Sequence, residues 1–436
     1  MIWIGIDDTD STSGGCTTHL ACALIKKFIN NNYDIIGCPR LVRLNPNIPW
    51  KTRGNGAISF QIGKGKGSKK KIGEIDNKAV YIYKENISEK HINSQIIENV
   101  EKMLNLYARI DDEKTNPGFV LMKKRPDYNT YKKAVQGVVT LETTKELLDS
   151  LDAYYKGYKN CRGLIGATAS IAWISKNDYT NELIAYRKEE KWGSKRYVDD
   201  ESTKKMDRTY PSTFDNYDYK NKHNRIVPNS PCPVLFGIRG TDEKDLVNAK
   251  KIIKSEKIES WLIFKTNQAS DDHLQKTTIN KIKPYQSVIV EGILTKTPYT
   301  KKGGHVFFKI KNSTGEIDCA AYEPTKNFRE IIRELIIGDL VEVYGGIRKE
   351  PLTINIEKIK IKNLVIKEEK VENPVCLKCG KHMKSIGANQ GYRCIKCGEK
   401  SNKPKIKKIK RNIKTGFYEV PVCARRHLSK PLKIMR

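Results

Sequence analysis

Two closely spaced pairs of cysteines set the tightest local constraint on how this chain can fold. Cys376 and Cys379 form one Cys-x-x-Cys pair, Cys394 and Cys397 form the next, fourteen residues separate the pairs, and a glycine follows each. Thiolates three positions apart can turn back on one ion, so two such pairs hold a tetrahedral Zn²⁺. A redox pair or four unligated thiols would leave the doubled spacing unexplained. We therefore predict a zinc ribbon over residues 373–400, with a structural zinc because no ligand position is left open.

The remaining cysteines are dispersed, which does not fit a disulfide framework. They are Cys16, Cys22, Cys38, Cys161, Cys232, Cys319 and Cys423. No apolar run approaches the roughly 18 residues that span a bilayer, and the N-terminus shows no secretory pattern. We expect a reduced, cytoplasmic protein that does not enter a membrane, and no feature of the sequence requires a protein partner.

The charge balance is strongly basic. Lysine and arginine number 81 against 50 acidic residues, which gives a formal net charge of +31. Such an excess favours a polyanionic partner, most simply nucleic acid. A lysine-rich compositional bias is the alternative, and it accounts for only part of the imbalance. At 436 residues the chain has room for about three or four domains.

Residues 284–366 consist of short β-type segments separated by turn residues. Five strands with one helix between the third and fourth predict an OB-type barrel, with an SH3-like barrel or part of a sandwich as the alternative. The expected segments are Ser287–Leu294, His305–Lys311, Ile317–Tyr322, the helix Phe328–Leu335, Leu340–Tyr344 and Thr353–Ile361. Barrel aromatics can stack on bases, although Phe307 fits the core equally well. The candidates are Tyr285, Tyr299, Phe307 and Tyr322.

The preceding regions alternate strands with helices. In residues 1–155, apolar stripes at Leu20–Phe28 and Ile92–Leu104 follow helical spacing, and we expect both to be buried against a sheet. Residues 156–283 end in a strand–helix–strand pattern that is typical of a small ferredoxin-like domain. The sequence therefore predicts a multidomain protein of α/β and α+β classes.

The sequence also predicts the local structure of three further segments. Leu164–Trp173 is a short apolar run, which we interpret as a strand. Residues 187–230 are polar, rich in tyrosine and too long for a simple turn, which favours a functional loop. Residues 401–436 are dominated by lysine and arginine and indicate a basic tail, either solvated or laid on a phosphate backbone.

A short apolar strand at residues 2–6 leads into three carboxylates, Asp7, Asp8 and Asp10, which are followed by a glycine turn and an amphipathic helix. Clustered carboxylates repel one another unless a cation lies between them, and Mg²⁺ is commonly held by a few carboxylates and substrate phosphates. A helix that begins after glycines also offers free N–H groups to an anion. The alternative is an Asp-rich turn that caps a helix and binds nothing. The stretch indicates a metal–nucleotide site.

Four motifs together resemble the archaeal tRNA(Ile2) 2-agmatinylcytidine synthetase family. They are Gly5-Ile6-Asp7-Asp8-Thr9-Asp10-Ser11 with Cys16-Thr17-Thr18, Arg40-Leu41-Val42-Arg43-Leu44-Asn45-Pro46-Asn47-Ile48-Pro49, Lys51-Thr52-Arg53-Gly54-Asn55-Gly56, and Asp111-Asp112-Glu113-Lys114-Thr115-Asn116-Pro117-Gly118. The resemblance covers essentially the whole chain. It implies a kinase-like domain at 1–155, a ferredoxin-like domain at 156–283, an OB fold at 284–366, the zinc ribbon and the basic tail.

The resemblance also implies an activity. The family is an ATP-dependent ligase that attaches agmatine to C2 of the wobble cytidine of tRNA(Ile2), so that the base pairs with A and AUA is decoded. ATP is consumed to AMP and phosphate: the base is first phosphorylated, and agmatine then displaces that phosphate. A threonine of the N-terminal loop becomes autophosphorylated, and the motif places it at Thr17 or at the neighbouring Thr18. The implied partners are tRNA(Ile2), agmatine and ATP.

The same resemblance suggests roles for individual side chains. Asp7, Asp8 and Asp10 would hold Mg²⁺ against ATP and, with Thr17 and Thr18, would form the catalytic group.

Nucleotide contacts are suggested for two charged segments. Lys51, Arg53 and Asn55 lie on a glycine-flanked segment, with a surface-charge role as the alternative. Asp112, Glu113 and Lys114 precede a Pro-Gly turn, with a salt-bridged turn as the alternative.

The agmatine pocket is not located by the sequence. Agmatine carries an amine and a guanidinium, so its pocket needs carboxylates or aromatic faces. Four loop residues are candidates, with ordinary loop charges as the alternative: Asp199, Asp200, Glu201 and Asp215.

Two other classes of function compete with this interpretation. A non-enzymatic zinc-ribbon and OB-fold nucleic-acid-binding protein would explain residues 285–436 and the charge, but it leaves the acidic cluster and residues 40–56 without a role. A nuclease would use the carboxylates to organise metal ions for phosphodiester cleavage.

Overall fold

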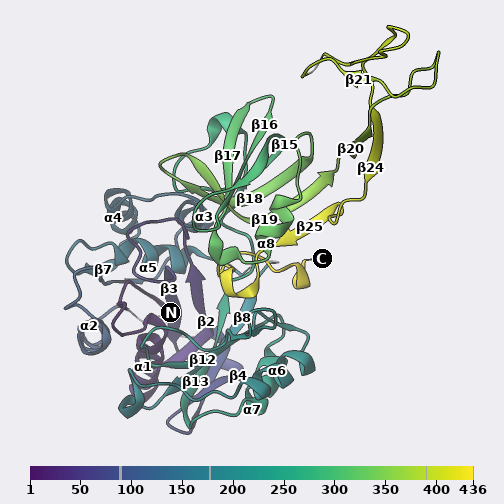
Figure 1. Ribbon diagram of the computed structural model, residues 1–436. Coiled ribbons are helices and arrows are strands. Elements are labelled where there is room, and N and C mark those ends of the chain that lie inside the picture. The colour runs from purple at the N-terminus through teal and green to yellow at the C-terminus, as the bar shows by residue number, and fades with distance from the viewer. Residues whose placement is uncertain (88–90, 176–177, 389, 436) are drawn as a thin grey trace.

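The structure, a computed structural model, describes residues 1–87, 91–175, 178–388 and 390–435. A mixed α/β body carries a β-barrel, and a small ribbon projects from the barrel on a two-stranded arm (Figure 1). Within the ranges described, no helix has the length and apolar character needed to cross a membrane. The predicted multidomain α/β and α+β class is confirmed.

One sheet of eleven strands runs through the whole body, in the order β7-β6-β1-β3-β2-β5-β4-β13-β8-β12-β9. Its members are β1 (Ile2–Asp7), β2 (Asp34–Arg43), β3 (Gly56–Gly63), β4 (Gly65–Ile75), β5 (Lys78–Asn86), β6 (Gly118–Met122), β7 (Tyr154–Gly157), β8 (Thr180–Arg187), β9 (Thr213–Phe214), β12 (Val234–Gly240) and β13 (Ile258–Thr266). Strand β13 pairs with β4 and, in parallel, with the end of β2. The first two predicted regions therefore share one sheet.

In the part of the chain that the structure describes, seven helices cover this sheet: α1 (Thr17–Asn30), α2 (Ser94–Tyr107), α3 (Tyr128–Gln136), α4 (Leu141–Ser150), α5 (Gly163–Ala172), α6 (Asp200–Thr209) and α7 (Glu243–Ile252). The helical stripes are buried as predicted: Leu20, Leu24 and Phe28 of α1 are fully inaccessible and pack with Val100 and Leu104 of α2. Burial of these apolar faces stabilises the body by about 25 cal/mol per Å² removed from water.

Helix α5 corrects the expectation of a strand at Leu164–Trp173. Almost every residue of α5 is buried, so the run has no polar face that would reveal a helical period. The helix packs unusually close to β1: a Cβ at Gly5 would lie 2.5 Å from the carbonyl oxygen of Ala167. This close contact fixes the end of β1, where the acidic cluster begins.

The barrel confirms the predicted OB-type order. It contains β15 (Ser287–Thr300), β16 (Val306–Asn312), β17 (Gly315–Ala321), the helix α8 (Phe328–Arg333), β18 (Leu340–Arg348) and β19 (Thr353–Asn363). Strand β15 pairs with both β16 and β18, and β17 closes onto β19 in parallel. The short strand β14 (Leu274–Lys276) adds to β15 and joins barrel and body.

The ribbon stands apart from the rest of the molecule (Figure 1). Strands β20 (Lys367–Glu372) and β24 (Lys405–Ile409) form the arm, and the ribbon holds β21 (Lys384–Ser385), β22 (Tyr392–Arg393) and β23 (Lys400–Ser401). Its apolar cluster consists of little more than Met383, Tyr392 and the cysteines. So small a core implies that the cysteine site itself stabilises the ribbon.

The predicted basic tail is wrong as a separate unit. Strand β25 (Gly416–Glu419) pairs with β19 of the barrel. Beyond it the chain returns to the body, where Leu428 is buried against Tyr131 and Trp173, and Arg425 forms an ion pair with Asp215. The tail therefore closes over the junction between barrel and body.

The predicted loop at 187–230 is also partly ordered. It contains α6 and the short strands β9, β10 (Tyr217–Asp218) and β11 (His223–Asn224). Single 3-10 turns lie at Glu189–Lys191, Ile279–Lys281, Glu323–Thr325, Val422–Ala424 and Leu432–Ile434.

A buried ionic cluster holds the barrel, the body and the returning C-terminal segment together. His273 Nε2 lies 2.8 Å from Glu357 Oε1, and Lys358 Nζ donates to Asp271 at 2.8 Å. Burial alone would raise the pKa of Glu357, but the charges of His273, Arg426 and Lys358 outweigh it and lower this pKa to about 2. The ionised carboxylate is therefore favoured by folding.

We expect Glu357→Gln to destabilise the fold at neutral pH, and the loss to shrink in acid. The folded pKa of Glu357 is below its ordinary value of 4.5, so its contribution is present above pH 4.5 and disappears as the pH falls toward 2. A shift of this size corresponds to about 3 kcal/mol. Urea unfolding at pH 7 and pH 3 measures it, with the exposed Glu350→Gln as control. Equal losses at both pH values would contradict the assignment.

Candidate functional site

The three carboxylates lie at the C-terminal end of β1 and in the turn that follows it. Strand β1 lies between β3 and β6, and the chain turns sharply after Asp7 because Asp8 adopts a left-handed conformation with φ of 55°. Gly15, with φ of 70°, completes the loop before α1, and a Cβ there would lie 3.2 Å from the carbonyl oxygen of Thr9. The turn brings Asp7, Asp8 and Asp10 to one cavity.

Asp7 is the most deeply buried of the three, with 9% of its surface exposed. Burial raises its pKa well above the ordinary value, and the charges of Asp8 and Asp10 add to the effect. Burial also raises the pKa of Asp8. A Cβ at Gly166 of α5 would lie 1.8 Å from Asp7 Oδ2, so glycine is needed there. The strand end concentrates negative charge that is unfavourable without a cation.

Hydrogen bonds orient the other two carboxylates. Asp8 accepts from Thr52 Oγ1 at 2.9 Å and from the Asn116 backbone N–H at 3.1 Å. Arg53 Nε donates to Asp10 Oδ2 at 2.6 Å and the same guanidinium donates to Ser230 Oγ at 2.8 Å. Segments 51–56 and 111–118, distant in sequence, are thus joined at the acidic loop.

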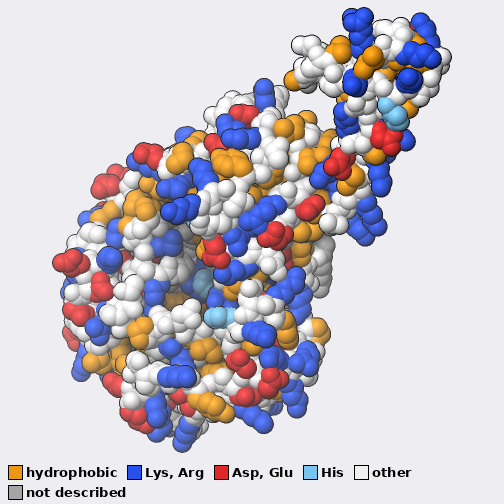
Figure 2. Space-filling model, in the orientation of Figure 1, with side chains coloured by type: hydrophobic (Ala, Val, Ile, Leu, Met, Phe, Trp, Pro, Cys, Tyr) orange, Lys and Arg blue, Asp and Glu red, His pale blue; other side chains and the backbone are white. Residues whose placement is uncertain are grey.

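The carboxylates form one wall of a cavity of about 530 Å³ between the two halves of the sheet. A hollow in the body is visible in the space-filling view (Figure 2). The lining also holds a group that we call the cationic wall, which consists of the guanidinium groups of Arg43, Arg225 and Arg239 and, beside them, the uncharged imidazole of His427. Among the described residues, Arg43 Nε is buried without a hydrogen-bond partner. A cavity lined by both carboxylates and guanidinium groups suits a metal-bound polyphosphate.

The structure places many of the predicted site residues in this cavity. Asp7, Asp8, Asp10, Thr17, Thr18, Lys51, Arg53 and Asn55 all line it. Thr9 Oγ1 donates to Thr17 Oγ1 at 3.1 Å, and Thr18 Oγ1 lies 3.0 Å from Cys16 Sγ. Both threonines therefore present hydroxyls near the helix N-terminus, and their roles stay predictions.

Asp112, Glu113 and Lys114 lie outside the cavity lining. The Lys114 backbone N–H donates to Asp112 Oδ1 at 2.9 Å, and the Lys114 carbonyl accepts from Asn116 Nδ2 at 2.9 Å. These hydrogen bonds hold the turn that brings the Asn116 N–H to Asp8. A direct contact of Asp112, Glu113 or Lys114 with the nucleotide stays a prediction.

The four agmatine candidates have local partners. Asp199 caps α6 by accepting from the Ser202 N–H, and Glu201 pairs with Lys204. Asp200 accepts from Asn224 and Asp215 pairs with Arg425. Within the cavity lining that the structure describes, none of the four appears.

The cationic wall was not anticipated from the sequence, apart from the motif that includes Arg43. Its four side chains come from the end of β2, from β12, from the segment after β11 and from the last ten residues. The sequence gives little sign of these residues: on β12, for example, Arg239 is a half-buried position between the buried Ile238 and Gly240.

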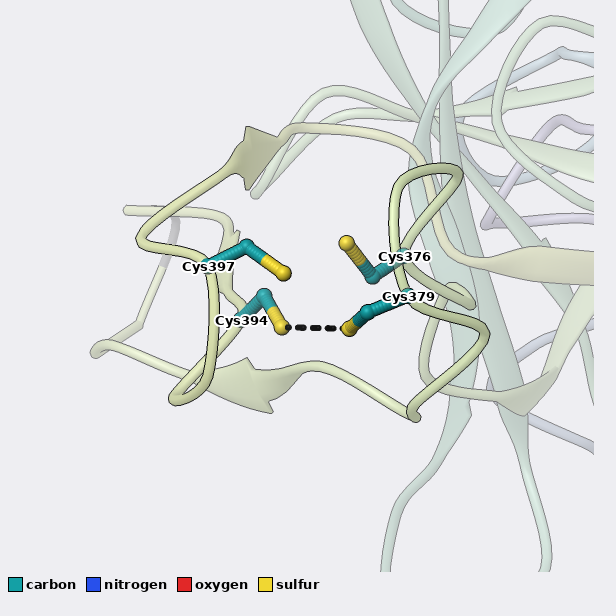
Figure 3. Close-up of side chains that lie close together, drawn as sticks. All are labelled: Cys376, Cys379, Cys394 and Cys397. Carbon is teal, nitrogen blue, oxygen red and sulfur yellow. Dashed lines mark hydrogen bonds between the residues drawn. The ribbon is translucent and has the colours of Figure 1, made fainter.

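The four predicted zinc ligands come together. The sulfur atoms of Cys376, Cys379, Cys394 and Cys397 lie within 4.8 Å of one another and point toward a common centre (Figure 3). Cys379 Sγ and Cys394 Sγ are 3.5 Å apart. Four thiols from two knuckles suit one tetrahedral Zn²⁺.

Basic and aromatic side chains cover the barrel and ribbon. Tyr299 stacks on Phe307, with ring centroids 5.9 Å apart, and Tyr322 meets Phe307 edge-on at 6.1 Å. Phe307 is half-buried, so it belongs to this surface cluster as well as to the barrel. Lysine and arginine gather over the arm and ribbon (Figure 2). Such a surface matches stacked bases beside phosphates.

Comparisons with known proteins place each part of the chain. Family models match in order: "TiaS TCKD domain" at residues 3–160, "TiaS FLD domain" at 161–273, "OB-fold nucleic acid binding domain" at 281–362 and "TiaS C-terminal zinc ribbon domain" at 373–413.

Relatives and solved structures that match over the full length of the chain carry the same family name. The tRNA(Ile2) 2-agmatinylcytidine synthetase TiaS of Methanocaldococcus jannaschii is 43% identical and covers 100% of this chain and 99% of its own. A crystal structure of a TiaS–tRNA(Ile2)–ATP complex matches with a TM-score of 0.85 and 40% identity, covering 100% of this chain and 97% of that one. A TiaS–tRNA(Ile2)–AMPCPP–agmatine complex matches with a TM-score of 0.83 and 38% identity over the same shares.

Proposed function

Because the chain belongs to the tRNA(Ile2) 2-agmatinylcytidine synthetase family, we propose that it conjugates agmatine to C2 of the wobble cytidine of tRNA(Ile2) in the cytoplasm, consuming ATP to AMP and phosphate. The observation that carries the proposal is the single cavity that is lined both by Asp7, Asp8 and Asp10 and by the guanidinium groups of Arg43, Arg225 and Arg239. A binding module has no need for such a cavity.

The acidic wall fits Mg²⁺. Among the described residues no side chain donates a hydrogen bond to Asp7, and burial makes its lone charge unfavourable. Asp7 and Asp8 would hold the ion, while Arg53 keeps Asp10 oriented beside them. When bound, Mg²⁺ neutralises charge on the triphosphate and on the transferring phosphoryl group.

The arginines of the cationic wall would bind and orient the phosphates of ATP. The C2 carbonyl oxygen of cytosine is a poor leaving group, and phosphorylation converts it into a good one. The transferring phosphoryl group carries charge on its equatorial oxygens, which positioned guanidinium donors stabilise. Within the described part of the chain Arg43 Nε has no hydrogen-bond partner, so Arg43 and its neighbour in the lining, Arg225, would take this role. Thr17 or Thr18, at the cavity edge of α1, would accept the phosphoryl group in autophosphorylation.

The target cytidine must leave its stack to expose C2 to this cavity. The ribbon and the barrel would then grip the remainder of the tRNA, the ribbon through its basic side chains and the barrel through Tyr299, Phe307 and Tyr322. Most of the binding energy would come from backbone contacts, so affinity should fall steeply with salt.

Mass spectrometry of the anticodon loop tests the function. After incubation of tRNA(Ile2) with the protein, ATP, Mg²⁺ and agmatine, we expect the wobble nucleoside to gain the mass of agmatine minus water. The gain should require every component, and a tRNA with uridine at the wobble position serves as control. Binding of tRNA without any mass gain or ATP turnover would favour a binding module, and a shortened RNA would favour a nuclease.

A further inference from the structure

The imidazole of His427, which belongs to the C-terminal segment, lines the cavity. The backbone fixes its place: the Ala269 N–H donates to the His427 carbonyl at 2.8 Å, and the next residue, Leu428, is 2% exposed. The His427 side chain itself is exposed to the cavity, and a Cβ at Gly54 would lie 3.4 Å from its Nε2. The ring therefore borders the same space as Arg53 and the acidic loop.

A chain of buried hydrogen bonds decides which ring nitrogen carries the proton. The amide Nε2 of Gln268 donates to the carboxylate of Glu182, so the Gln268 carbonyl oxygen faces the other way. That oxygen lies 3.0 Å from His427 Nδ1. A carbonyl only accepts, so Nδ1 must carry the hydrogen and Nε2 must hold a free lone pair. Gln268 is fully buried and Glu182 is 4% exposed, so the chain is rigid.

The surrounding charges keep this lone pair available. The cation of Arg43 lowers the pKa of His427 well below its ordinary value, and the enclosure of the ring within the cavity and the charges of Arg239 and Arg225 add to the effect. These groups and, through Gln268, Glu182 are the charges that face the ring. A bound polyphosphate would offset the arginines and raise the pKa of the imidazole, making it a stronger base once the nucleotide has arrived.

We propose that His427 is the general base that takes a proton from the attacking amine of agmatine, with Glu182 and Gln268 as positioning residues. This assignment rests on the proposed function. In the step, His427 Nε2 takes one proton from the ammonium group of agmatine, and the freed amine nitrogen forms a bond to C2. The C2–O bond breaks, its electron pair leaves on the phosphate, and the phosphate takes up the second proton of the nitrogen. A positioned base of this kind contributes about 100- to 10,000-fold.

The test compares His427→Gln with the zinc-loaded full-length protein, with the exposed His91→Gln as matched control. Glutamine keeps a polar side chain but cannot take up a proton. With tRNA(Ile2), ATP, Mg²⁺ and agmatine at pH 7, we expect conjugation to fall at least about 100-fold. ATP affinity and thermal midpoint should stay unchanged. Above pH 7 the variant's rate should rise about tenfold per pH unit, as free amine becomes available, while the parent protein's rate changes little.

A second variant, Gln268→Met, removes the acceptor that sets the tautomer and should lower conjugation with the same rising pH profile. A parent-like rate and profile in His427→Gln would overturn the assignment, as would a rate loss matched by lost ATP affinity or folding. Failure of the parent protein to conjugate agmatine would overturn the proposed function itself, and the assignment with it.

Discussion

Asp8→Ala is expected to abolish ATP turnover while leaving tRNA affinity within about twofold. Asp8 lines the cavity, and its carboxylate is held by Thr52 and by the Asn116 backbone. Removing a group that positions a metal ion against a transferring phosphoryl group costs several kcal/mol of transition-state stabilisation, or about 1,000-fold or more in rate. The measurement is tRNA-dependent AMP formation, beside a filter-binding titration with tRNA(Ile2).

Two further variants sharpen this test. Asp8→Asn keeps one oxygen for the Thr52 hydrogen bond but removes the charge, so a loss equal to that of Asp8→Ala would show that charge matters and not shape. Asp111→Ala removes an exposed carboxylate nearby, whose side chain is 71% exposed, and should change nothing. An Asp8→Ala protein with full turnover would rule out the magnesium assignment.

The acidic loop and the ribbon could be predicted because their functional side chains come from short stretches of sequence. Three carboxylates within four positions, or four cysteines in two knuckles, are close in space whatever the remaining fold is. The OB barrel was predictable for a related reason: its strands alternate buried and exposed residues, as in Ser287–Leu294. Local pattern and tertiary structure agree in these parts.

Helix α5 shows why another part of the fold was not predictable. Its residues 163–172 are buried on every side, because β1 and β6 lie against one face and α3 and α4 against others. A helix without a polar face has no 3.6-residue period, and a short apolar run cannot be distinguished from a buried strand. Only the glycines, Gly163 and Gly166, mark the close approach to Asp7 that requires them.

The cationic wall could not be predicted because it is assembled from four distant segments. Arg239 looks like an ordinary strand residue and Arg225 like a loop charge. His427 lies in what the composition presents as a basic tail. Its place in the cavity depends on β25 pairing with β19 and on Leu428 entering the core of the body. No spacing within the sequence carries that information, because the pairing partners are more than fifty residues apart.

Removal of zinc is the second large effect that we expect, and it should separate tRNA binding from the chemistry. The ribbon has almost no apolar core beyond Met383 and Tyr392, so loss of one thiolate should unfold it. Cys394→Ser should weaken tRNA(Ile2) binding by about 30-fold or more, because the ribbon's lysines and arginines lose their fixed arrangement over the phosphates.

The measurements in this experiment distinguish the role of the ribbon from that of the body. Zinc content and tRNA affinity should fall together, whereas nucleotide affinity should hold, since the cavity lies in the body and the ribbon projects away from it (Figure 1). Cys161→Ser, a free cysteine outside the ribbon, is the matched control. The salt dependence of the residual binding should also flatten, because fewer phosphates are neutralised. Unchanged tRNA affinity in a zinc-free protein would show that the barrel and body hold the tRNA without the ribbon.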